Sequence, residues 1–546
     1  MINFLLSAFI STLSYFLAGK ILFNNKFNTR KINTFEQIIY GFIIISFVSV
    51  LINFFYPLSK LVNTIFFFTM IFIFFFSKNK IDKKEILILF FVSLCVCAFI
   101  FFDTINRPDG MLYHYPFSKI INEEKIILGI SNIHFRFAHH SILQYSAAIN
   151  INYLTGDNGI VIPIGCIYIS ILLYIINELL ISLKQKNYSL SKVFLCLIAL
   201  FLTYKINRYS KIGNDDIGHL ISFLIIYKFL DYNKIKIDHF KEITLFSTFA
   251  VANKFTLILI FFIPLIILVQ NKTYFKKIFF SLSSLFLIIW IFKNLLISGC
   301  LFYPIEKTCL KSLSWTNINM LKSEKISGEA WAKDWPNYEN KNNDNDMKNY
   351  IKNFKWLKTW SQNHLKIILK NVLPFLLVMI LLISYNHKKN FLKKKNILKE
   401  KFFYIFFFAA AGSIIFFLKF PLYRYGYSYI IILISLVAAI FINDRNINKM
   451  SKIIKFTVIF TVVILSSKQF LRYYNFYDLR PFSPIYINPN LKLEKIKLEN
   501  NFSYYLNNNS QNCWYNKSIC TYYKNNNIEM NLYKNYKILS LKKNNF

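Results

Sequence analysis

The sequence predicts an all-α polytopic membrane protein with about 13–14 transmembrane helices. Hydrophobic residues make up 55% of its 546 residues, including 60 phenylalanines. They come in long blocks with few charges, and each block has the length that a helix needs to cross the hydrocarbon core. Short loops rich in lysine separate many of the blocks, as the topology of membrane proteins requires.

Each apolar block predicts one membrane-spanning helix. The span count is open at 242–270, where the first of two adjoining blocks is short. The blocks lie near 2–18, 38–56, 62–77, 85–102, 158–182, 192–204, 216–230, 242–253, 255–270, 278–297, 366–384, 402–418, 427–443 and 456–467.

The lysines also predict how the chain is oriented. The first block has no charge before it and Lys20 after it, the reverse of a cleaved signal peptide, so we expect a retained span with its N-terminus outside. The inner loops are then all basic, as the positive-inside rule requires. The high isoelectric point therefore reflects these loops, and no nucleic-acid partner is expected. The loops are "KFNTRK", "KNKIDKKE", "KQKNYSLSK", "NKIKIDHFK", "NKTYFKK", "NHKKNFLKKKNILKEK" and "DRNINKMSKIIK".

This orientation divides the chain into groups of spans and long outer segments. The spans form N-terminal, central and C-terminal groups, and the tail is expected to be a small extramembrane domain. The segments are spans 1–102, outer loop 103–157, spans 158–297, outer loop 298–365, spans 366–467 and outer tail 468–546.

The eight cysteines agree with this division. Four of them lie in predicted spans and are ordinary small apolar residues: Cys95, Cys97, Cys166 and Cys196. The other four form two local pairs on the outer face, where an oxidising compartment permits disulfides. We expect disulfides Cys300–Cys309 and Cys513–Cys520, with four unpaired thiols as the alternative. Neither spacing has the second half of a zinc site.

The outer loop at 103–157 has an unusual polar content. From 110 to 124 apolar residues recur at roughly helical spacing, which predicts a helix lying in the membrane interface with Asp109 at its N-cap position. A second such element is expected over 131–151. Polar residues gather at its start: Asn132, His134, Arg136, His139, His140 and Ser141.

Asp109 allows two interpretations. It caps the helix and does nothing more, or it belongs to a functional site with Tyr113, His114 and the later arginine and histidines. Charges held at the depth of the membrane are costly and tend to mark function, which favours the second interpretation.

Other polar positions on the same face are candidates for the same site. Asp215 and Asp216 stand where a span re-enters from outside, and adjacent carboxylates on a helix point in different directions. Either one caps the helix and one faces a cavity, or both are solvated caps. Arg424 and Arg136 suit a phosphate group, which a guanidinium can hold with two hydrogen bonds. Arg424 is alternatively an anchor in an aromatic belt, and Lys254 alternatively extends to the surface.

The histidines and tryptophans of the outer face are ambiguous. His139 and His140 are about 100° apart on a helix, a poor arrangement for a metal pair, and no third ligand follows at a regular interval. The tryptophans of 298–365 stack on the faces of sugars or anchor the segment at the membrane surface. These residues are Trp315, Trp331, Trp335, Trp356 and Trp360.

The loop "DGMLYH", followed by "NEEKIILG", resembles the first outer loop of the GT-C superfamily of glycosyltransferases. These are integral membrane enzymes that take sugars from polyprenyl-phosphate donors. In that superfamily an acidic residue opens the loop and a tyrosine often follows one turn later, and Asp109 and Tyr113 match these positions. The resemblance implies that Asp109 is the base that activates the acceptor hydroxyl, or that it orients donor and acceptor.

The chain is more closely similar to a largely uncharacterised set of bacterial multi-spanning membrane proteins. The shared stretches run, in order, through "DGMLYH", "GISNIHFRFAHHS", "LISGCLFYP", "WAKDWP", "KFPLYRYGY" and "NCWYNKSICTYY". The similarity implies the bacterial inner membrane, and the orientation predicted from the lysines then places both termini on the periplasmic side. The chain departs from the GT-C pattern because its acidic loop follows the fourth predicted span instead of the first. Either three spans precede the GT-C core or the superfamily assignment is wrong.

The resemblance implies an inverting transferase that moves one sugar from a polyprenyl phosphate to a cell-envelope glycan or lipid-linked acceptor on the periplasmic face. The expected catalytic residues are Asp109 and His114. The expected substrate-binding residues are Tyr113, Arg136, His139, Asp215 and Arg424. His114 and Asp215 would position substrate or a divalent cation. The alternatives are a transporter or flippase of a lipid-linked or small polar substrate, and a polymerase or ligase of surface glycan. Ionisable residues at the junctions of loops and spans favour the enzyme over the transporter.

Overall fold

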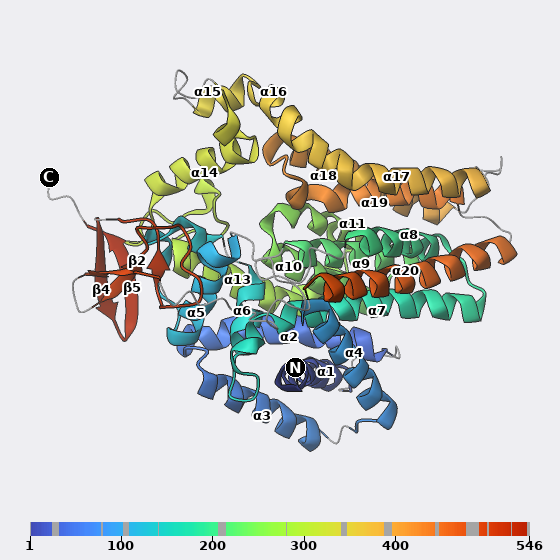
Figure 1. Cartoon of the computed structure of the whole chain (residues 1–546), viewed down its shortest axis with the longest axis horizontal. Coiled ribbons are helices and arrows are strands. Elements are labelled where there is room, and N and C mark those ends of the chain that lie inside the picture. The colour runs from blue at the N-terminus through green and yellow to red at the C-terminus, as the bar shows by residue number, and fades with distance from the viewer. Residues whose placement is uncertain are drawn as a thin grey trace.

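The computed structural model is a helical body with a small group of strands at one end (Figure 1). It describes residues 2–24, 32–77, 80–101, 109–139, 141–205, 215–279, 281–339, 347–386, 396–442, 447–476, 491–498, 502–525 and 527–542.

The longer helices account for most of the described chain. In the N-terminal part they are α1 (Ile2–Asn24), α2 (Thr34–Phe55), α3 (Lys60–Phe76), α4 (Lys83–Phe101), α5 (Tyr115–Glu123), α6 (Ile142–Ile149), α7 (Ile162–Gln185), α8 (Leu190–Lys205), α9 (Asp216–Asp231) and α10 (Ile237–Asn253). The later helices are α11 (Phe262–Gln270), α12 (Tyr274–Phe279), α13 (Leu282–Ser298), α14 (Ile318–Ala332), α15 (Met347–Lys352), α16 (Trp356–Trp360), α17 (Lys366–Asn386), α18 (Asn396–Lys419), α19 (Tyr423–Ile442) and α20 (Ile447–Phe476).

The predicted apolar blocks coincide with helices throughout. The block at 255–270 begins with a 3₁₀ segment, Phe255–Phe261, before α11. Among the described residues, seven helical stretches are long and apolar enough to cross a membrane, which identifies a multi-pass membrane protein. The larger count of spans stays a prediction. The seven stretches are Ile2–Leu22, Thr34–Phe55, Ile162–Gln185, Trp356–Tyr385, Glu400–Lys419, Tyr423–Ile442 and Ile447–Asn475.

Helices α1 and α2 pack against each other at very short range. A Cβ atom added to Gly41 would lie 1.7 Å from the backbone oxygen of Tyr15, so the two backbones approach as closely as only a glycine permits. Small residues allow this contact between membrane helices, where association depends on close packing. The α1–α2 pair in turn packs on α7, at one side of the core.

The centre of the body is formed by helices that are buried on all sides. All fifteen residues from Asp216 to Leu230 of α9 are buried, and so is every residue of α6. Ion pairs tie the buried helices together at their ends. Lys228 of α9 contacts Glu36 of α2 at 2.5 Å and Glu242 of α10 at 2.6 Å, with all three side chains nearly inaccessible. The central helices therefore form a fixed frame for the loops that connect them.

The outer segment that contains α14, α15 and α16 stands apart from the helical body (Figure 1). Its core is a cluster of aromatic rings, in which Tyr350, Trp356 and Trp360 are buried. The indole nitrogen of Trp360 donates to the backbone oxygen of Pro421 at 2.8 Å. This bond fixes the outer segment to the short loop that leads into α19.

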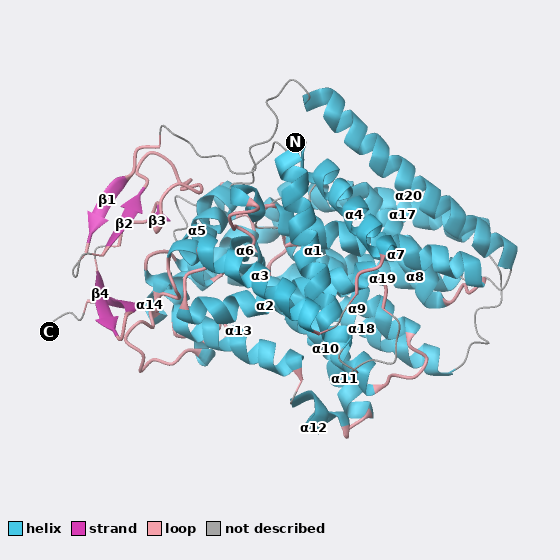
Figure 2. Ribbon diagram, turned by 90° about the horizontal axis from the view of Figure 1, so that it is seen from below, coloured by secondary structure: helices cyan, strands magenta, loops and turns pink. Residues whose placement is uncertain are grey.

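The C-terminal tail forms two small sheets, and its position outside the membrane stays a prediction. One contains β1 (Glu494–Lys497), β2 (Ser503–Leu506) and β3 (Cys520–Thr521), and the other contains β4 (Ile528–Tyr533) and β5 (Tyr536–Leu541). Both β1–β2 and β4–β5 are antiparallel, and β2–β3 is parallel. The strands lie at one end of the long axis next to α5 (Figures 1 and 2).

Disulfides close one loop in each of the two outer regions. They join Cys300 to Cys309 and Cys513 to Cys520. The four remaining cysteines are free thiols in helices, and Cys166 and Cys196 are buried. The cysteines of the two predicted outer segments are therefore paired in disulfides, and those of the apolar helices are free.

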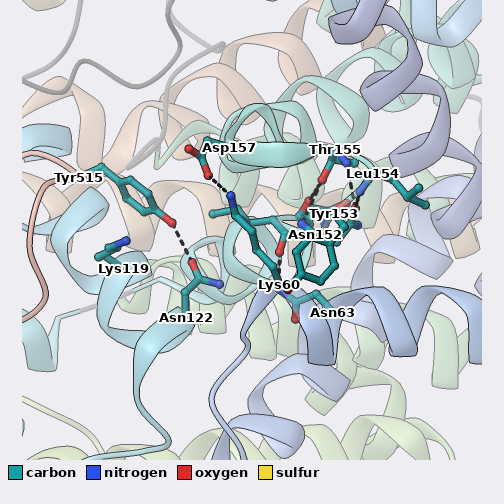
Figure 3. A network of polar contacts seen from close by, with 12 residues as sticks. Lys60, Asn63, Lys119, Asn122, Asn152, Tyr153, Leu154, Thr155, Asp157 and Tyr515 are labelled. Carbon is teal, nitrogen blue, oxygen red and sulfur yellow. Dashed lines mark hydrogen bonds and ion pairs between the residues drawn. The ribbon is translucent and has the colours of Figure 1, made fainter.

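A network of polar contacts holds α5 in place (Figure 3). The side-chain amide of Asn122 donates to the backbone oxygens of Leu58 and Ala148, at 2.6 and 2.9 Å. Its oxygen accepts a bond from the Tyr515 hydroxyl of the tail at 3.2 Å, and the ammonium of Lys119 lies over the ring of Tyr515. Three distant segments therefore meet at one face of α5.

The outer loop differs from its predicted form in two respects. Asp109 does not cap the helix, because its backbone is helical and its side chain makes no capping bond. The chain instead enters a π-helical turn, Gly110–His114, that continues into α5. The second element is divided into two 3₁₀ turns and α6, and α6 packs inside the protein against α2 and α5. The interfacial position of α5 stays a prediction.

Candidate functional site

The centre of the candidate site is a carboxylate held between two guanidinium groups. Arg424 Nη1 donates to Asp109 Oδ2 at 2.6 Å, and Arg136 Nη1 donates to Asp109 Oδ1 at 3.4 Å. Asp109 begins the π-helical turn, Arg136 lies in the 3₁₀ turn Phe135–Ala138, and Arg424 lies in the first turn of α19. The side chains are 20 to 33% exposed, so solvent and small groups reach them.

The π-helical turn places two more predicted residues beside this ion pair. The guanidinium carbon of Arg136 lies 5.2 Å from the centre of the Tyr113 ring, within the range of a cation–π interaction. His114 Nδ1 lies 2.6 Å from the amide nitrogen of Gln144. Since an amide nitrogen can only donate, Nδ1 accepts and Nε2 of the neutral ring carries the proton. Gln144 is held in turn by the capping box that it forms with Ser141 at the start of α6.

A second ion pair adjoins the first. Lys254 Nζ lies 2.9 Å from Asp215 Oδ1, and the same ammonium lies 4.3 Å from the centre of the Tyr425 ring. The Tyr425 hydroxyl accepts a bond from Arg424 Nη2 at 3.1 Å, which joins the two ion pairs. Of the adjacent carboxylates, Asp215 is therefore the one that faces the site.

The position of Arg424 depends on a histidine that the sequence analysis did not single out. His219 of α9 is completely buried, and its Nε2 lies 3.0 Å from the backbone oxygen of Arg424. Its Nδ1 lies 2.7 Å from the hydroxyl of Ser428, one turn further along α19. One sequence signal exists, because His219 follows Asp215 by four residues and therefore shares its helix face. The histidine thus couples α9 to the first turn of α19.

The electrostatics of the site keep Asp109 ionised and His114 neutral. Burial alone would raise the pKa of Asp109, but the charge and hydrogen bond of Arg424 lower it below 3.8, with weaker help from His114 and Arg136. Burial lowers the pKa of His114 to about 4, and the carboxylates of Asp109 and Asp215 offset this only in part. At neutral pH the imidazole is therefore an uncharged hydrogen-bonding group.

Asp215 is ionised for a similar reason. Burial raises the pKa of its carboxyl, and the charges of Lys254 and Arg424 outweigh that effect and lower it. The three ion pairs, two of which share Asp109, thus contain three cations, Arg136, Lys254 and Arg424, against two carboxylates. The five charged groups leave one unit of positive charge for a ligand.

His139 lies at the edge of the site. It is exposed, and its ring stands edge-on to Tyr303 with 4.8 Å between the ring centres. His140 lies outside the described residues. The described residues contain no group of three or more histidine, cysteine, aspartate or glutamate side chains that is arranged to hold a metal ion.

The C-terminal tail covers the loop that holds Asp109. The backbone nitrogens of Cys513 and Trp514 both donate to the backbone oxygen of Met111, at 3.1 and 2.9 Å. Further along the tail, the ring of Tyr522 stands edge-on to His134. These contacts were not predicted, because no spacing in the sequence relates residues that are some 400 positions apart.

The structure brings most of the predicted site residues together. Asp109, Tyr113, His114, Arg136 and Arg424 contact one another directly or through one neighbour. Asp215 joins them through Lys254 and Tyr425, and His139 lies beside them. The roles of these residues stay predictions, whereas their proximity is a property of the fold.

Comparison with known proteins identifies one family. A family model described as a domain of unknown function (DUF8201) matches residues 1–431, which include Asp109, Arg136, Asp215 and Arg424. No curated protein and no solved structure matches the chain.

Proposed function

We propose a function from the site itself, because the chain belongs to the DUF8201 family, which is described as a domain of unknown function. The proposed activity is that of a GT-C-type glycosyltransferase. The enzyme transfers one sugar from a polyprenyl-phosphate donor to a cell-envelope glycan or lipid-linked acceptor. The reaction takes place on the periplasmic face of a bacterial inner membrane.

One observation carries this proposal. A single carboxylate, Asp109, lies between Arg424 and Arg136. Asp109 and Arg136 belong to the same outer loop, 27 positions apart, and Arg424 comes from the first turn of α19. Guanidinium groups bind phosphate oxygens with two parallel hydrogen bonds, and a carboxylate can accept the proton of a hydroxyl. The site thus combines the two groups that sugar transfer from a phosphate ester requires.

The charge of the site supports a donor with one phosphate. The three cations and two carboxylates of the site leave one positive charge in excess. A polyprenyl-phosphate sugar is a phosphodiester with one negative charge, so its binding neutralises the site. A diphosphate donor has at least two negative charges and would leave a net negative charge in a partly buried place, which is unfavourable.

Because Asp109 is paired with the arginines, donor binding also changes the pKa of Asp109. When phosphate oxygens take the guanidinium groups of Arg424 and Arg136, Asp109 loses its partners and its pKa rises, since burial then dominates. The carboxylate becomes a stronger base only after the donor has bound. An acceptor hydroxyl is then deprotonated when the reacting sugar is in place.

The proposed reaction uses these groups in sequence. Asp109 takes the proton of the acceptor hydroxyl, and the acceptor oxygen forms a bond to the anomeric carbon. The bond between that carbon and the phosphate oxygen breaks, and the leaving phosphate keeps the electron pair. Arg424 and Arg136 neutralise its developing charge. Attack opposite to the leaving group inverts the anomeric configuration.

The remaining predicted residues position the substrates. His114 is neutral, and Nε2 of its ring offers a hydrogen bond to a sugar hydroxyl. Tyr113 orients Arg136, and Lys254 holds Asp215 beside Arg424. His139, at the exposed edge, is available to the acceptor. A divalent cation does not fit the described residues, because Asp215 is paired with Lys254 and no ligand set surrounds it, so no step passes through one.

Native mass spectrometry of protein purified in mild detergent tests the proposal. The wild type should retain a polyprenyl phosphate or its sugar ester, Arg424→Ala should lose it, and Asp109→Asn should keep it. Loss in the arginine variant alone supports the separate roles of the two residues. If no such lipid binds to any of the three proteins, even when it is added, the proposed function is wrong.

A transporter or flippase is the second candidate, and one observation favours it. Lys293 lies in the C-terminal half of α13 and is completely buried, in a helix that has no other charged residue. Ionisable residues deep inside the membrane region often mark a transport path. A flippase moves the lipid-linked sugar intact, whereas the transferase releases the bare lipid phosphate. Analysis of the lipid product therefore distinguishes the two.

A further inference from the structure

Trp331 differs from the other six tryptophans of the chain. It is 48% exposed, whereas the other tryptophans are buried or partly buried. Trp356 and Trp360 belong to the aromatic core of the outer segment, and Trp315 donates its indole hydrogen to the backbone oxygen of Leu295. These tryptophans have structural roles. Trp331 has a large surface available for a ligand.

The backbone that carries the exposed ring is held in a fixed place. Its neighbours in α14, Ala330 and Ala332, are buried, and Lys333 forms an ion pair of 2.7 Å with Glu329 in the same turn. The outer segment is also bonded to the loop before α19 through Trp360 and Pro421. The backbone at Trp331 therefore does not need to be ordered when a ligand arrives, which lowers the entropic cost of binding.

The ring lies next to the proposed phosphate site. The guanidinium carbon of Arg424 is 5.9 Å from the centre of the Trp331 ring, and the same guanidinium contacts Asp109. A phosphate bound by Arg424 would bring its ester substituents within reach of the indole. In the predicted topology the outer segment covers the outer side of the site. The polyprenyl chain returns to the membrane, so the substituent that faces Trp331 is the sugar.

The chemistry of the indole suits a sugar ring. One face of a pyranose presents several carbon–hydrogen groups. Moving this face from water onto a flat apolar surface costs little hydration free energy, because few hydrogen bonds to water are broken. The hydroxyls at the edge of the sugar stay free for polar partners such as His114. An arginine beside the indole also fixes the distance between the phosphate and the stacked ring.

We infer that Trp331 forms the sugar subsite of the donor, in which a hexose attached to the lipid phosphate stacks on the indole next to Arg424. The inference rests on the proposed function, and it adds the chemical group that this part of the site recognises. The alternative role for Trp331 is an anchor at the membrane interface. An anchor would affect stability but would not distinguish a sugar ester from a bare lipid phosphate.

The test compares two kinds of lipid on the same protein. Affinities are measured by native mass spectrometry for undecaprenyl phosphate and for its glucosyl, mannosyl and galactosyl esters. At least one ester should bind the wild type more tightly than the bare lipid. Trp331→Ala should weaken binding of that ester by about tenfold and leave the bare lipid unchanged, and Trp331→Phe should retain most of the preference. Leu357→Ala, which truncates another exposed apolar side chain of the same outer segment, is the matched control.

Three results overturn the inference. The first is a wild type that prefers none of the esters, and the second is a Trp331→Ala variant that keeps the full preference. The third is an equal loss of affinity for ester and bare lipid in that variant, which indicates a structural role. All three leave the phosphate site intact as long as the bare lipid binds and Arg424→Ala abolishes its binding. A wild type that binds neither lipid overturns the proposed function and the sugar subsite together.

Discussion

The guanidinium of Arg424 donates to the carboxylate of Asp109 over 2.6 Å, although 315 positions separate the two residues in the chain. Arg136 contacts the other oxygen of the same carboxylate. A carboxylate in this position is ionised and at the same time a weak base, because both neighbours stabilise its charge. In the proposed mechanism Asp109 therefore becomes an effective base only when a ligand takes the arginines, and this coupling leads to testable consequences.

The activity should depend on pH through Asp109. Because Arg424 holds the pKa of this carboxyl below 3.8 in the free protein, kcat/KM should decline only at a pH below that value. In Arg424→Gln the main charge that lowers the pKa is gone, so the acidic limb of the residual activity should move to higher pH. Lys419→Gln removes an exposed cation that has no contact with Asp109 and should leave the limb in place. An unchanged limb in Arg424→Gln would contradict the assignment of the base.

The stability of the protein should decrease in mild acid through His114. Its pKa in the folded protein is about 4, below the ordinary value of 6.5, so the unfolded chain binds its proton more readily. The stability is complete above pH 6.5 and is lost as the pH falls from 6.5 towards 4, by up to about 3 kcal/mol. His114→Asn keeps a polar group without this titration, and its unfolding temperature should decline less over the same range. Equal declines in the two proteins would show that His114 does not contribute.

The disulfide of the tail should be necessary for full activity. The loop that Cys513–Cys520 closes supplies the two backbone bonds to Met111, two residues after Asp109. The double variant Cys513→Ser, Cys520→Ser should release this contact and reduce transfer roughly tenfold or more, since small displacements of catalytic groups are costly. The control is Cys95→Ser, Cys97→Ser, which changes free thiols of α4. Full activity in the tail variant would mean that the tail does not position the loop.

The packing of α1 on α2 should tolerate no side chain at Gly41. An added methyl group would meet the backbone of Tyr15, so Gly41→Ala should destabilise the protein by about 1–3 kcal/mol through overpacking. Gly328→Ala is the matched control, because no atom lies within 4 Å of the added Cβ and the change favours the helix α14. Unfolding temperatures in detergent should fall for the first variant and stay equal or rise for the second.

Much of the architecture can be predicted from local patterns. Apolar blocks locate the helices because burial in lipid or protein requires them, and the spacing of outer cysteines anticipates both disulfides. The candidate residues Asp109 and Arg424 are visible as charges near apolar blocks, and Arg136 belongs to the polar residues that gather within the outer loop. Charges held at the membrane are costly, which is why these positions indicate function.

The contacts between these residues could not be predicted from the sequence. Of the two interpretations of Asp109, local patterns do not exclude the helix cap, whereas in the structure its side chain makes no capping bond and pairs with Arg424. The amphipathic pattern of α6 indicates one polar face, and it does not reveal whether protein or lipid covers the other. His219 and the tail contact to Met111 depend on segments that only the complete fold brings together.

The most direct test of the account measures the fate of a labelled donor. Membranes that contain the protein are given a polyprenyl-phosphate hexose labelled in the lipid, and the appearance of bare polyprenyl phosphate is followed over time. The wild type should release it, and Asp109→Asn should release it at least about a hundredfold more slowly while still binding the donor, as expected for loss of a general base. Asp157→Asn, which changes an exposed carboxylate paired with Lys60, should behave like the wild type. Equal release by wild type and Asp109→Asn would contradict the account, and so would a donor that crosses the membrane intact.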